Sequence, residues 1–433
     1  MGSSAKKTSA AIVVHIFVVL SLGRSFFHIC YSTLAVAKCK KSAIMALVMK
    51  ILIPSDLHWP TINGVATFSR TLAKGLADRG HEVIVIAPSQ TGRRYKEVDG
   101  NYVIYRTRSV PFPFYQNFRI STMPQREVKK IIEDFEPDVI HIQMLMWIGQ
   151  AAMRYGNRYG IPIVSTNHAM PENLMDNLKL LAPVARPVNY MLKQYGRRFH
   201  SKSDAVTMPT ESAIEMFNVS LPRPMRAISN GINLSCFTPG KAPAKLYTKF
   251  KIPRKKPLVT YVGRLDAEKH LWVLVKAFAK IYKKTGAHLV LVGAGTDSDA
   301  LNTLVHRMKL TRYVTFTGRV TDEEIRQLQQ IGTVFAMPSP AELQSIATLE
   351  AMASGQPIVA VKAGALAELC QHERNGILCD KDNIDQMADG LEKILSDSSL
   401  RDRMAAESLA IAKTHDIEYT LNEFEALYDE IMK

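Results

Sequence analysis

Two glutamates, Glu342 and Glu350, lie in the segment PSPAELQSIATLEAMASGQPIVAV, with seven residues between them. If a helix starts near Ser345, Glu350 points inward from that helix and Glu342 lies just before its N-terminus. The first N–H groups of a helix lack intrahelical partners and carry the positive end of its dipole, which suits a phosphate. One carboxylate can then hold sugar hydroxyls and the other a ribose. The segment therefore predicts a binding site for a nucleotide diphosphate sugar.

This segment resembles the donor site of the retaining glycosyltransferases of family 4, in which a Glu-x7-Glu signature is followed by a sequence like EAMASGQPIVA. Other features of that family occur in the same order, so the resemblance covers the chain from Met49 to its C-terminus. It implies an α/β protein with the GT-B fold, in which two Rossmann-like domains face each other across a cleft. It also implies that the protein is a hexosyltransferase.

Two further segments match the family's contacts with the donor diphosphate. GRLDAEKH, residues 263–270, directly follows an apolar run, and the resemblance implies that Arg264 and Lys269 hold the leaving diphosphate. A guanidinium offers a planar fork and an ammonium a point charge, and both neutralise charge on the leaving group. Gly64 lies at the start of a predicted helix, where glycine lets backbone N–H groups approach a phosphate closely.

The glutamate segment departs from the commonest family pattern at Ser345, where many relatives have glycine. A serine still presents its backbone N–H and can cap the helix. We therefore expect Glu342 to hold hydroxyls of the donor sugar and Glu350 to hold those of the ribose. Ser345 and Ile346 are expected to contact the donor at the helix start. A solvated helix position for Glu350 is the weaker alternative, because its neighbours are apolar.

Histidines lie at the ends of two apolar runs in the first half of the chain. Relatives often have His-x-His where this chain has HIQ at residues 141–143, so a role of the second histidine does not transfer to Gln143. His168 ends the next run, at the sheet edge where α/β sites form, and we expect it beside the donor sugar or the acceptor hydroxyl. A loop histidine without such a role is the alternative. The surrounding TNHAMPEN resembles lipid-glycosylating members and includes Asn167 and Glu172.

The expected mechanism needs no protein nucleophile. A retaining transfer can proceed on one face of the sugar, with the leaving diphosphate taking the acceptor proton, while the protein positions the reactants and stabilises charge. Asp297-Ser298-Asp299 has the form of a DxD metal motif, which belongs to the other large glycosyltransferase fold. Here it follows a GAG turn and is better explained as the cap of a helix. We predict no metal and no other cofactor.

Apolar runs alternate with helical segments from Met49 onward, which predicts parallel sheets with helices on both faces. MKILIPS is the first predicted strand, and residues 65–79 follow it as an amphipathic helix that ends before Gly80. Two long amphipathic segments, residues 383–411 and 418–432, end the chain.

A segment rich in proline and in Lys and Arg, residues 236–256, predicts a linker between two domains. The first is the expected acceptor-binding domain and the second the expected nucleotide-sugar-binding domain. The resemblance implies that the last helix crosses back onto the first domain. The predicted divisions are a leader over residues 1–48, domains over 49–235 and 257–415, and the crossing helix over 416–433.

The first 48 residues differ from the rest. Two lysines precede an apolar run, residues 10–22, and weaker apolar character continues beyond Arg24. Three interpretations fit this pattern. The segment is a cleavable signal, or a weak membrane anchor, or it is not translated because the true start is Met45 or Met49. We favour a weak anchor or a later start, because an enzyme that uses a cytosolic nucleotide sugar has little reason to be exported.

The chain carries a formal charge of +15, from 55 Lys and Arg against 40 Asp and Glu, which predicts an anionic partner. Two segments mix basic with aromatic or aliphatic residues, as membrane-surface segments do: residues 106–119 and 179–202. A merely basic surface on a soluble enzyme is the alternative, and no motif supports nucleic acid. The basic residues of the two segments are Arg106, Arg108, Arg119, Lys179, Arg186, Lys193, Arg197, Arg198 and Lys202.

Five scattered cysteines without a CxxC pair argue against disulfides or a zinc site.

These features predict a cytoplasmic enzyme that is peripheral at the inner face of the membrane. We expect it to move glucose from UDP-glucose to a lipid such as diacylglycerol, with retention. The alternative within this class is a GDP-mannose-dependent mannosyltransferase that acts on a phosphatidylinositol or a glycan. An alternative from another class is a non-catalytic membrane- or carbohydrate-binding protein on a GT-B scaffold. The intact set of charged site residues argues against that alternative.

Overall fold

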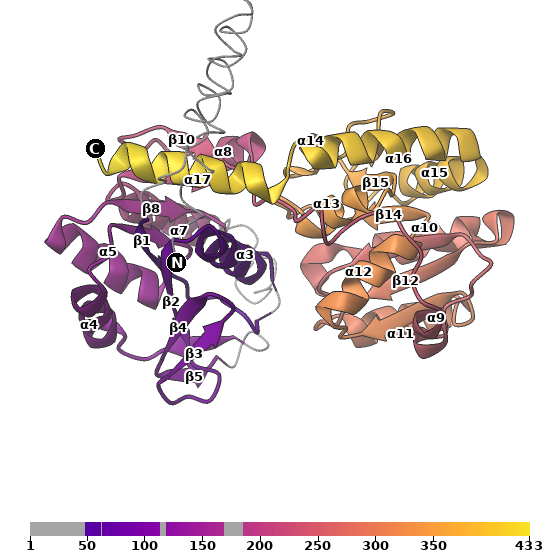
Figure 1. Cartoon of the computed structure of the whole chain (residues 1–433). Coiled ribbons are helices and arrows are strands. Elements are labelled where there is room, and N and C mark those ends of the chain that lie inside the picture. The colour runs from indigo at the N-terminus through magenta and orange to yellow at the C-terminus, as the bar shows by residue number, and fades with distance from the viewer. Residues whose placement is uncertain (1–47, 62, 113–117, 169–184) are drawn as a thin grey trace, which may run out of the picture. The chain divides into compact units, whose positions relative to one another are not determined.

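The computed structural model describes residues 48–61, 63–112, 118–168 and 185–433. Two parallel sheets, each covered by helices, account for most of these residues (Figure 1). The predicted leader lies outside the described residues except for Val48, and Glu172 lies outside them too. Within the described ranges, no helix is both long and apolar enough to span a membrane.

The first sheet has eight strands in the order β10-β9-β8-β7-β1-β2-β4-β3. Neighbours are parallel except β3 and β4, which are antiparallel. The chain runs outward from β1 through β2 and β4, then returns to β7 on the other side of β1, so the order reverses between β1 and β7. The strands are β1 (Lys50–Pro54), β2 (Glu82–Pro88), β3 (Tyr95–Asp99), β4 (Tyr102–Thr107), β7 (Val139–Ile142), β8 (Ile163–Thr166), β9 (Ala205–Met208) and β10 (Met225–Ala227), with β5 (Ser109–Pro111) and β6 (Arg119–Ser121) paired separately.

The second sheet has six parallel strands in the order β13-β12-β11-β14-β15-β16. As in the first sheet, the chain first adds strands on one side of the starting strand and then on the other, so the strand order reverses between β11 and β14. In open α/β sheets, ligands bind beyond the carboxyl ends of the strands at such a reversal. The strands are β11 (Leu258–Val262), β12 (His288–Val292), β13 (Val314–Gly318), β14 (Val334–Met337), β15 (Ile358–Val361) and β16 (Gly376–Cys379).

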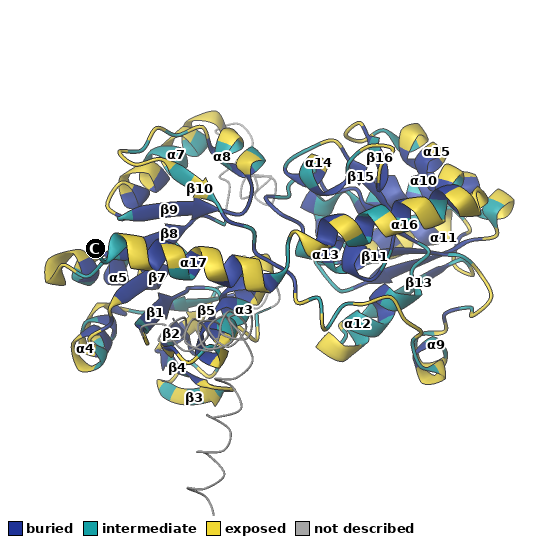
Figure 2. Ribbon diagram, turned by 45° about the horizontal axis from the view of Figure 1, so that its top comes forward, coloured by how far each residue is buried: buried dark blue, intermediate teal, exposed yellow. Residues whose placement is uncertain are grey.

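The helices show one buried and one exposed face, while the strands between them are buried (Figure 2). In α3, the side chain of Asn63 accepts a hydrogen bond from the N–H of Ala66 at 2.8 Å, and the predicted apolar stripe packs inward. The helices are α3 (Gly64–Asp78), α4 (Gln125–Phe135), α5 (Trp147–Tyr159), α7 (Ala185–His200), α8 (Glu211–Phe217), α9 (Ala244–Phe250), α10 (Leu271–Thr285), α11 (Ser298–Arg307), α12 (Asp322–Ile331), α13 (Ile346–Ala353), α14 (Leu366–Leu369), α15 (Ile384–Ser396), α16 (Ser398–Lys413) and α17 (Ile417–Ile431).

The last helix, α17, packs into the core of the first sheet. Leu421, Phe424 and Tyr428 lie in one buried cluster with residues of β1 and α3. A Cβ added to Gly75 of α3 would lie 2.6 Å from a methyl carbon of Leu421, so glycine allows the close contact between the two helices. The hydroxyl of Tyr428 lies 2.6 Å from Nδ1 of His141 in β7, whose Nε2 lies 2.6 Å from the hydroxyl of Thr166.

Three local predictions differ from the structure. The segment 383–411 is two helices, α15 and α16, because the side chain of Asp397 caps a new helix by accepting from the N–H of Leu400. The segment 236–256 contains α9, whose Leu246 packs into the second core. The interpretation of 106–119 as a membrane segment was wrong for Arg106, which is buried and donates to Glu97 and to backbone carbonyls.

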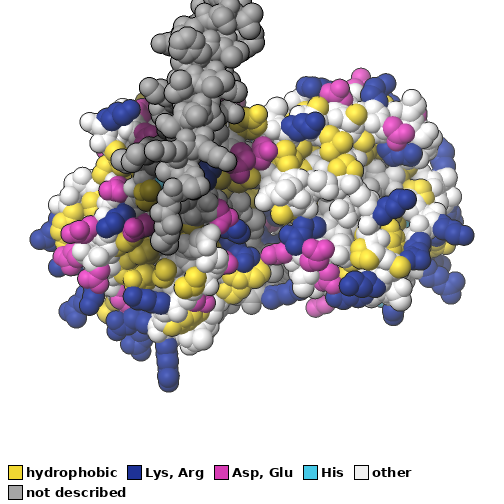
Figure 3. Space-filling model, viewed as in Figure 1, with side chains coloured by type: hydrophobic (Ala, Val, Ile, Leu, Met, Phe, Trp, Pro, Cys, Tyr) yellow, Lys and Arg dark blue, Asp and Glu magenta, His cyan; other side chains and the backbone are white. Residues whose placement is uncertain are grey.

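Positive charge is dispersed over the visible face of the molecule. Figure 3 shows Lys and Arg side chains spread along its edges, with Asp and Glu side chains among them. The charge of +15 therefore does not define one binding face in this view, and a membrane surface must be sought on individual elements.

Replacing Tyr428 with Phe tests the attachment of α17. The change removes the hydroxyl that bonds to Nδ1 of His141, and leaves a buried ring nitrogen without its partner. We expect the free energy of unfolding to fall by about 1–3 kcal/mol, measured by urea denaturation. Tyr419→Phe is the matched control, because Tyr419 lies on the same helix and is 62% exposed. Equal effects of the two changes would contradict this account.

Candidate active site

The predicted donor residues of the second domain meet where the strand order reverses. Arg264 and Lys269 follow β11, and Glu342 follows β14 just before α13. Because β11 and β14 are parallel neighbours, their carboxyl ends open at the same edge of the sheet. Nζ of Lys269 there donates to Oε1 of Glu342 at 2.7 Å. The structure thus brings together three residues that lie up to 78 positions apart in the chain (264 to 342).

Acidic side chains hold both cations in place. Arg264 pairs with Asp266 and Glu268, and Lys269 lies 3.6 Å from Glu268 as well as beside Glu342. Burial alone would lower the pKa of Lys269, but Glu342 and Glu268 outweigh burial and raise that pKa. Lys269 is therefore a firmly protonated, preoriented cation. An incoming diphosphate must compete with carboxylates for it.

The helix start predicted near Ser345 is confirmed. Oγ of Ser345 accepts from the N–H of Thr348 at 3.3 Å, and α13 begins at Ile346. This cap satisfies the third N–H of the helix, so those of Ile346 and Ala347 have no partner within the helix. These two groups and the helix dipole favour an anion beside Glu342.

Glu350 lies on α13, about 7 Å along the helix axis from Ser345 at the standard rise per residue. Burial raises the pKa of its carboxyl to about 8, although a hydrogen bond from Gln329 opposes the shift. Gln329 is itself held by Gln356, whose Nε2 donates to its Oε1 at 2.9 Å. Neither glutamine was predicted as a site residue. The sequence carries no clear signal for Gln329, because it lies in the polar segment DEEIRQLQQ.

Gly64, the predicted diphosphate contact of the first domain, is the first residue of α3. It is exposed, and a Cβ added to it would meet no atom within 4 Å. The cap by Asn63 satisfies the third N–H of α3, which leaves the first two without an intrahelical partner. The local geometry therefore suits an anion. Packing within the chain would also accept a larger residue at position 64.

His168 lies just beyond β8, and its Nε2 is 2.9 Å from Oε1 of Gln143, which follows β7. Its ring packs on Phe68 of α3, with 5.1 Å between the ring centroids. Burial lowers the pKa of His168 to about 3, so the imidazole is neutral. His141 is fully buried and bonded on both nitrogens, and it has a structural role. Asn167 is also buried.

Asp56, beyond the end of β1, was missed as a structural support of the first domain. Its two oxygens accept from the N–H groups of Ile148 and Gly149 at 3.0 and 3.3 Å, so it caps α5. Burial raises its pKa to about 7. In the sequence Asp56 is only an acidic residue in a predicted loop, because its hydrogen-bond partners lie more than 90 residues away.

Residues of the first domain also reach the loop that carries Glu342. Oγ1 of Thr210 donates to the carbonyl of Leu343 at 2.8 Å, and the N–H of Asn230 donates to Oε1 of Gln344 at 2.7 Å. The chain directly after Glu342 is therefore held at the carbonyl of Leu343 and at the side chain of Gln344. Asp297 occupies the position before α11, but its side chain makes no capping bond to that helix. The prediction that Asp297 caps this helix was therefore wrong.

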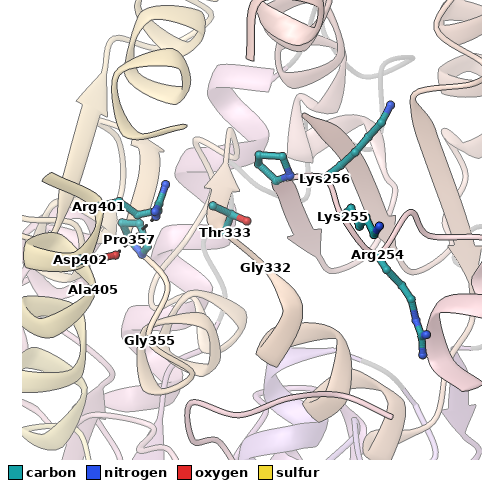
Figure 4. Close-up of a pocket in the computed structure, with 11 residues that line it drawn as sticks. Arg254, Lys255, Lys256, Gly332, Thr333, Gly355, Pro357, Arg401, Asp402 and Ala405 are labelled. Carbon is teal, nitrogen blue, oxygen red and sulfur yellow. Dashed lines mark ion pairs between the residues drawn. The ribbon is translucent and has the colours of Figure 1, made fainter. Parts of the chain in front are cut away.

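A separate open pocket of about 510 Å³ lies at the amino-terminal edge of the second sheet, before β11, β14 and β15. Figure 4 shows Arg401 on one side of Thr333, with Arg254, Lys255 and Lys256 on the other. These last three side chains are exposed and fan out in different directions. The pocket is on the opposite edge from Lys269 and Glu342, and it does not belong to the donor site.

Two glycosyltransferase families match most of the described chain. Residues 62–235 match the family described as Glycosyltransferase Family 4, and residues 245–409 match the family described as Glycosyl transferases group 1. The GDP-mannose-dependent alpha-mannosyltransferase of Mycolicibacterium smegmatis is 27% identical, over 78% of this chain and 86% of the relative. The alpha-monoglucosyldiacylglycerol synthase of Acholeplasma laidlawii is also 27% identical, over 77% of this chain and 85% of the relative.

Solved structures share the architecture. Sucrose-phosphate synthase of Thermosynechococcus elongatus aligns with a TM-score of 0.74 at 20% identity, covering 88% of this chain and 99% of that one. HepE of Anabaena, in complex with UDP-glucose, aligns with a TM-score of 0.67 at 20% identity, covering 88% of this chain and 100% of that one. At this identity the likeness concerns the fold.

The raised pKa of Glu350 predicts a pH-dependent stability. The folded chain keeps this proton up to about pH 8, whereas the unfolded carboxyl ionises near 4.5. The stabilisation is therefore complete below pH 4.5 and is lost as the pH rises to about 8. We expect the stability of Glu350→Gln, relative to the native chain, to increase by up to about 1.4 kcal/mol per pH unit in this window.

Urea denaturation across this pH range measures the difference between the two chains. Glu423→Gln is the control, because Glu423 is exposed on α17. A constant difference between Glu350→Gln and the native chain would contradict a protonated Glu350 in the folded chain.

Proposed function

Because the chain belongs to the family 4 glycosyltransferases and has the GT-B fold that its sequence predicts, we propose that it transfers a hexose from a nucleotide diphosphate sugar to a membrane lipid. The best candidate donor is UDP-glucose, and the best candidate acceptor is a diacylglycerol-type lipid. The observation that carries the proposal is the ion pair of Lys269 and Glu342 at the start of α13. This pair supports the proposal, because Lys269 can neutralise a diphosphate and the adjacent Glu342 can accept hydrogen bonds from a sugar.

The proposed roles follow from charge and position. Arg264, Lys269 and the first N–H groups of α13 bind the diphosphate, and Gly64 lets the start of α3 approach it from the first domain. Glu342 accepts hydrogen bonds from sugar hydroxyls once the diphosphate has drawn Lys269 away. Glu350 accepts from the ribose hydroxyls, which requires that its carboxyl lose the proton it holds in the free chain. Binding of the nucleotide is therefore coupled to proton release.

The proposed transfer proceeds with retention at the anomeric carbon. The bond from that carbon to the diphosphate oxygen breaks, and a bond to the acceptor oxygen forms on the same face of the sugar. The acceptor proton passes to the leaving diphosphate. Arg264 and Lys269 stabilise the charge that develops on this group, so the positive charge comes from side chains and no metal is part of the proposal.

The lipid acceptor is supported by α7. Its exposed apolar side chains are Tyr190, Met191 and Tyr195, with exposed fractions of 66%, 68% and 42%. Arg186, Arg197 and Arg198 on the same helix are exposed. Aromatic and aliphatic groups enter the membrane interface while arginines attract anionic headgroups. The diacylglycerol-directed relative adds support, since its name states a lipid product.

The second candidate is transfer of mannose from GDP-mannose to a phosphatidylinositol or a glycan. It is favoured by the GDP-mannose-dependent relative, which is as similar to this chain as the glucosyl-transferring relative, at 27% identity. The geometry of Lys269 and Glu342 serves both donors, because both carry a diphosphate and a hexose.

A donor panel tests the proposed reaction. We expect the full chain to release nucleotide from UDP-glucose, to form a glycolipid with diacylglycerol vesicles, and to retain this activity in EDTA. Lys269→Ala is expected to lower turnover by about 10²–10³-fold, because it removes a charge that stabilises the leaving group. Lys280→Ala is the control, since Lys280 is exposed on α10. Turnover of GDP-mannose alone would establish the second candidate, and no turnover of any donor would overturn both.

The surface of α7 has its own test. We expect the double change Tyr190→Ser and Met191→Ser to weaken sedimentation with anionic vesicles several-fold, because it removes the exposed apolar contacts. Nucleotide release from the donor without lipid should stay unchanged, because neither side chain contacts the donor site residues. Tyr159→Ser is the control, since Tyr159 is exposed on α5. Equal losses for both variants would place membrane contact elsewhere.

A further inference from the structure

Gln143 is a fully buried amide at the edge of the first sheet where the strand order reverses. Its backbone N–H donates to the carbonyl of Pro54 at 3.0 Å, so its main chain is fixed against the end of β1. Its Oε1 lies 2.9 Å from Nε2 of His168. Its Nε2 has no hydrogen-bond partner among the described residues. A buried donor without a partner lowers the free energy of unfolding, and an apolar side chain of this size would avoid that loss. Packing alone therefore does not explain the amide.

The contact with His168 determines which ring nitrogen carries the proton. An amide oxygen can only accept, so Nε2 of His168 must be the donor. A neutral imidazole has one N–H, and the proton on Nε2 leaves Nδ1 as a bare acceptor. The ring is held on a second side by Phe68, at 5.1 Å between centroids, and His168 is only half-buried.

Resting on the function proposed above, we propose that Gln143 is a positioning residue that holds His168 as its Nε2–H tautomer and so presents the Nδ1 lone pair to a hydroxyl group in the site. Gln143 itself need not touch a substrate. The fixed tautomer gives the site an acceptor of defined direction, whereas a freely exchanging imidazole would offer a donor or an acceptor to the same hydroxyl.

The surroundings keep this acceptor neutral. Burial is the cause that lowers the pKa of His168 to about 3, and burial together with His168 lowers the pKa of His141 to about 3. Phe68 and Gln143, which contact the ring, carry no charge. The Nδ1 lone pair is therefore available throughout the physiological pH range, and it contributes no pH dependence of its own in the native chain.

Two variants of Gln143 separate positioning from packing. Gln143→Leu removes the acceptor oxygen, keeps a similar volume and removes the unsatisfied amide, so the chain should fold. Gln143→Glu keeps an acceptor in place but puts a negative charge beside the ring, which raises the pKa of His168. Gln150→Leu is the control, since Gln150 is a hydrogen-bonded glutamine of the same domain that does not contact His168.

The first readout is the ¹⁵N resonances of His168 in the full chain labelled at histidine. We expect a single Nε2–H tautomer in the native chain that does not titrate above pH 5, and a mixture of tautomers in Gln143→Leu. A native Nδ1–H tautomer would mean that the amide of Gln143 is turned the other way, and it would overturn the proposal. So would an unchanged His168 spectrum in Gln143→Leu. This readout does not depend on turnover.

The second readout is the pH profile of transfer. We expect Gln143→Leu to lower kcat by about tenfold to a hundredfold, as misplacement of a group by about 1 Å can do, with UDP affinity unchanged. In Gln143→Glu the rate should fall as the pH drops through the raised pKa of His168 and recover above it, because only the neutral ring has the lone pair. Native rates in both variants would overturn the proposal. If the native chain showed no transfer, the proposed function would be contradicted. The ¹⁵N spectra would then decide the tautomer of His168 independently.

Discussion

The ion pair between Lys269 and Glu342 depends on the parallel pairing of β11 with β14. Both residues follow strands that end at the same edge, so a contact of 2.7 Å forms between side chains 73 residues apart. The winding of the sheet produces this edge, because β12 and β13 are added on one side of β11 and β14 to β16 on the other. A change in the strand order would separate Lys269 from Glu342, even if both residues were kept.

Burial shifts the pKa of acids and bases in opposite directions: it raises the pKa of a carboxyl and lowers the pKa of an imidazole. Glu350 and His168 are both neutral in the free chain, since burial raises the pKa of the first to about 8 and lowers that of the second to about 3. Lys269 stays charged because two carboxylates face it. The site thus holds its cations where a diphosphate would bind, next to Glu342 and to the two groups that are neutral in the free chain, Glu350 and His168, where hydroxyls would bind. This division suits a donor that combines a diphosphate with two polyols.

The sequence predicted the second-domain site better than the first. Arg264, Lys269, Glu342 and Ser345 lie in short segments directly after strands, so local pattern and strand order suffice to bring them together. The supporting residues were not predictable in this way. Gln329 reaches Glu350 from another helix, and Asp56 caps a helix more than 90 residues away. The buried position of Arg106 likewise depends on Glu97, across the strand pair β3 and β4 that the hydrophobic pattern did not reveal. Long-range polar contacts leave no periodic signal in a single sequence.

The crossing helix α17 is part of the support of the first-domain site, since aromatic contacts connect it to His168. Phe424 of α17 packs on Phe68 of α3 with 5.9 Å between centroids, and Phe68 packs in turn on His168. On the neighbouring strand, Tyr428 of α17 bonds to His141, which lies two residues before Gln143 and so on the same face of the sheet. The ring of His168 is held by Phe68 and by Gln143, and Phe68 rests on Phe424 of α17. Because α17 follows the second domain in the chain, the geometry of the first-domain site depends on residues at the far end of the sequence.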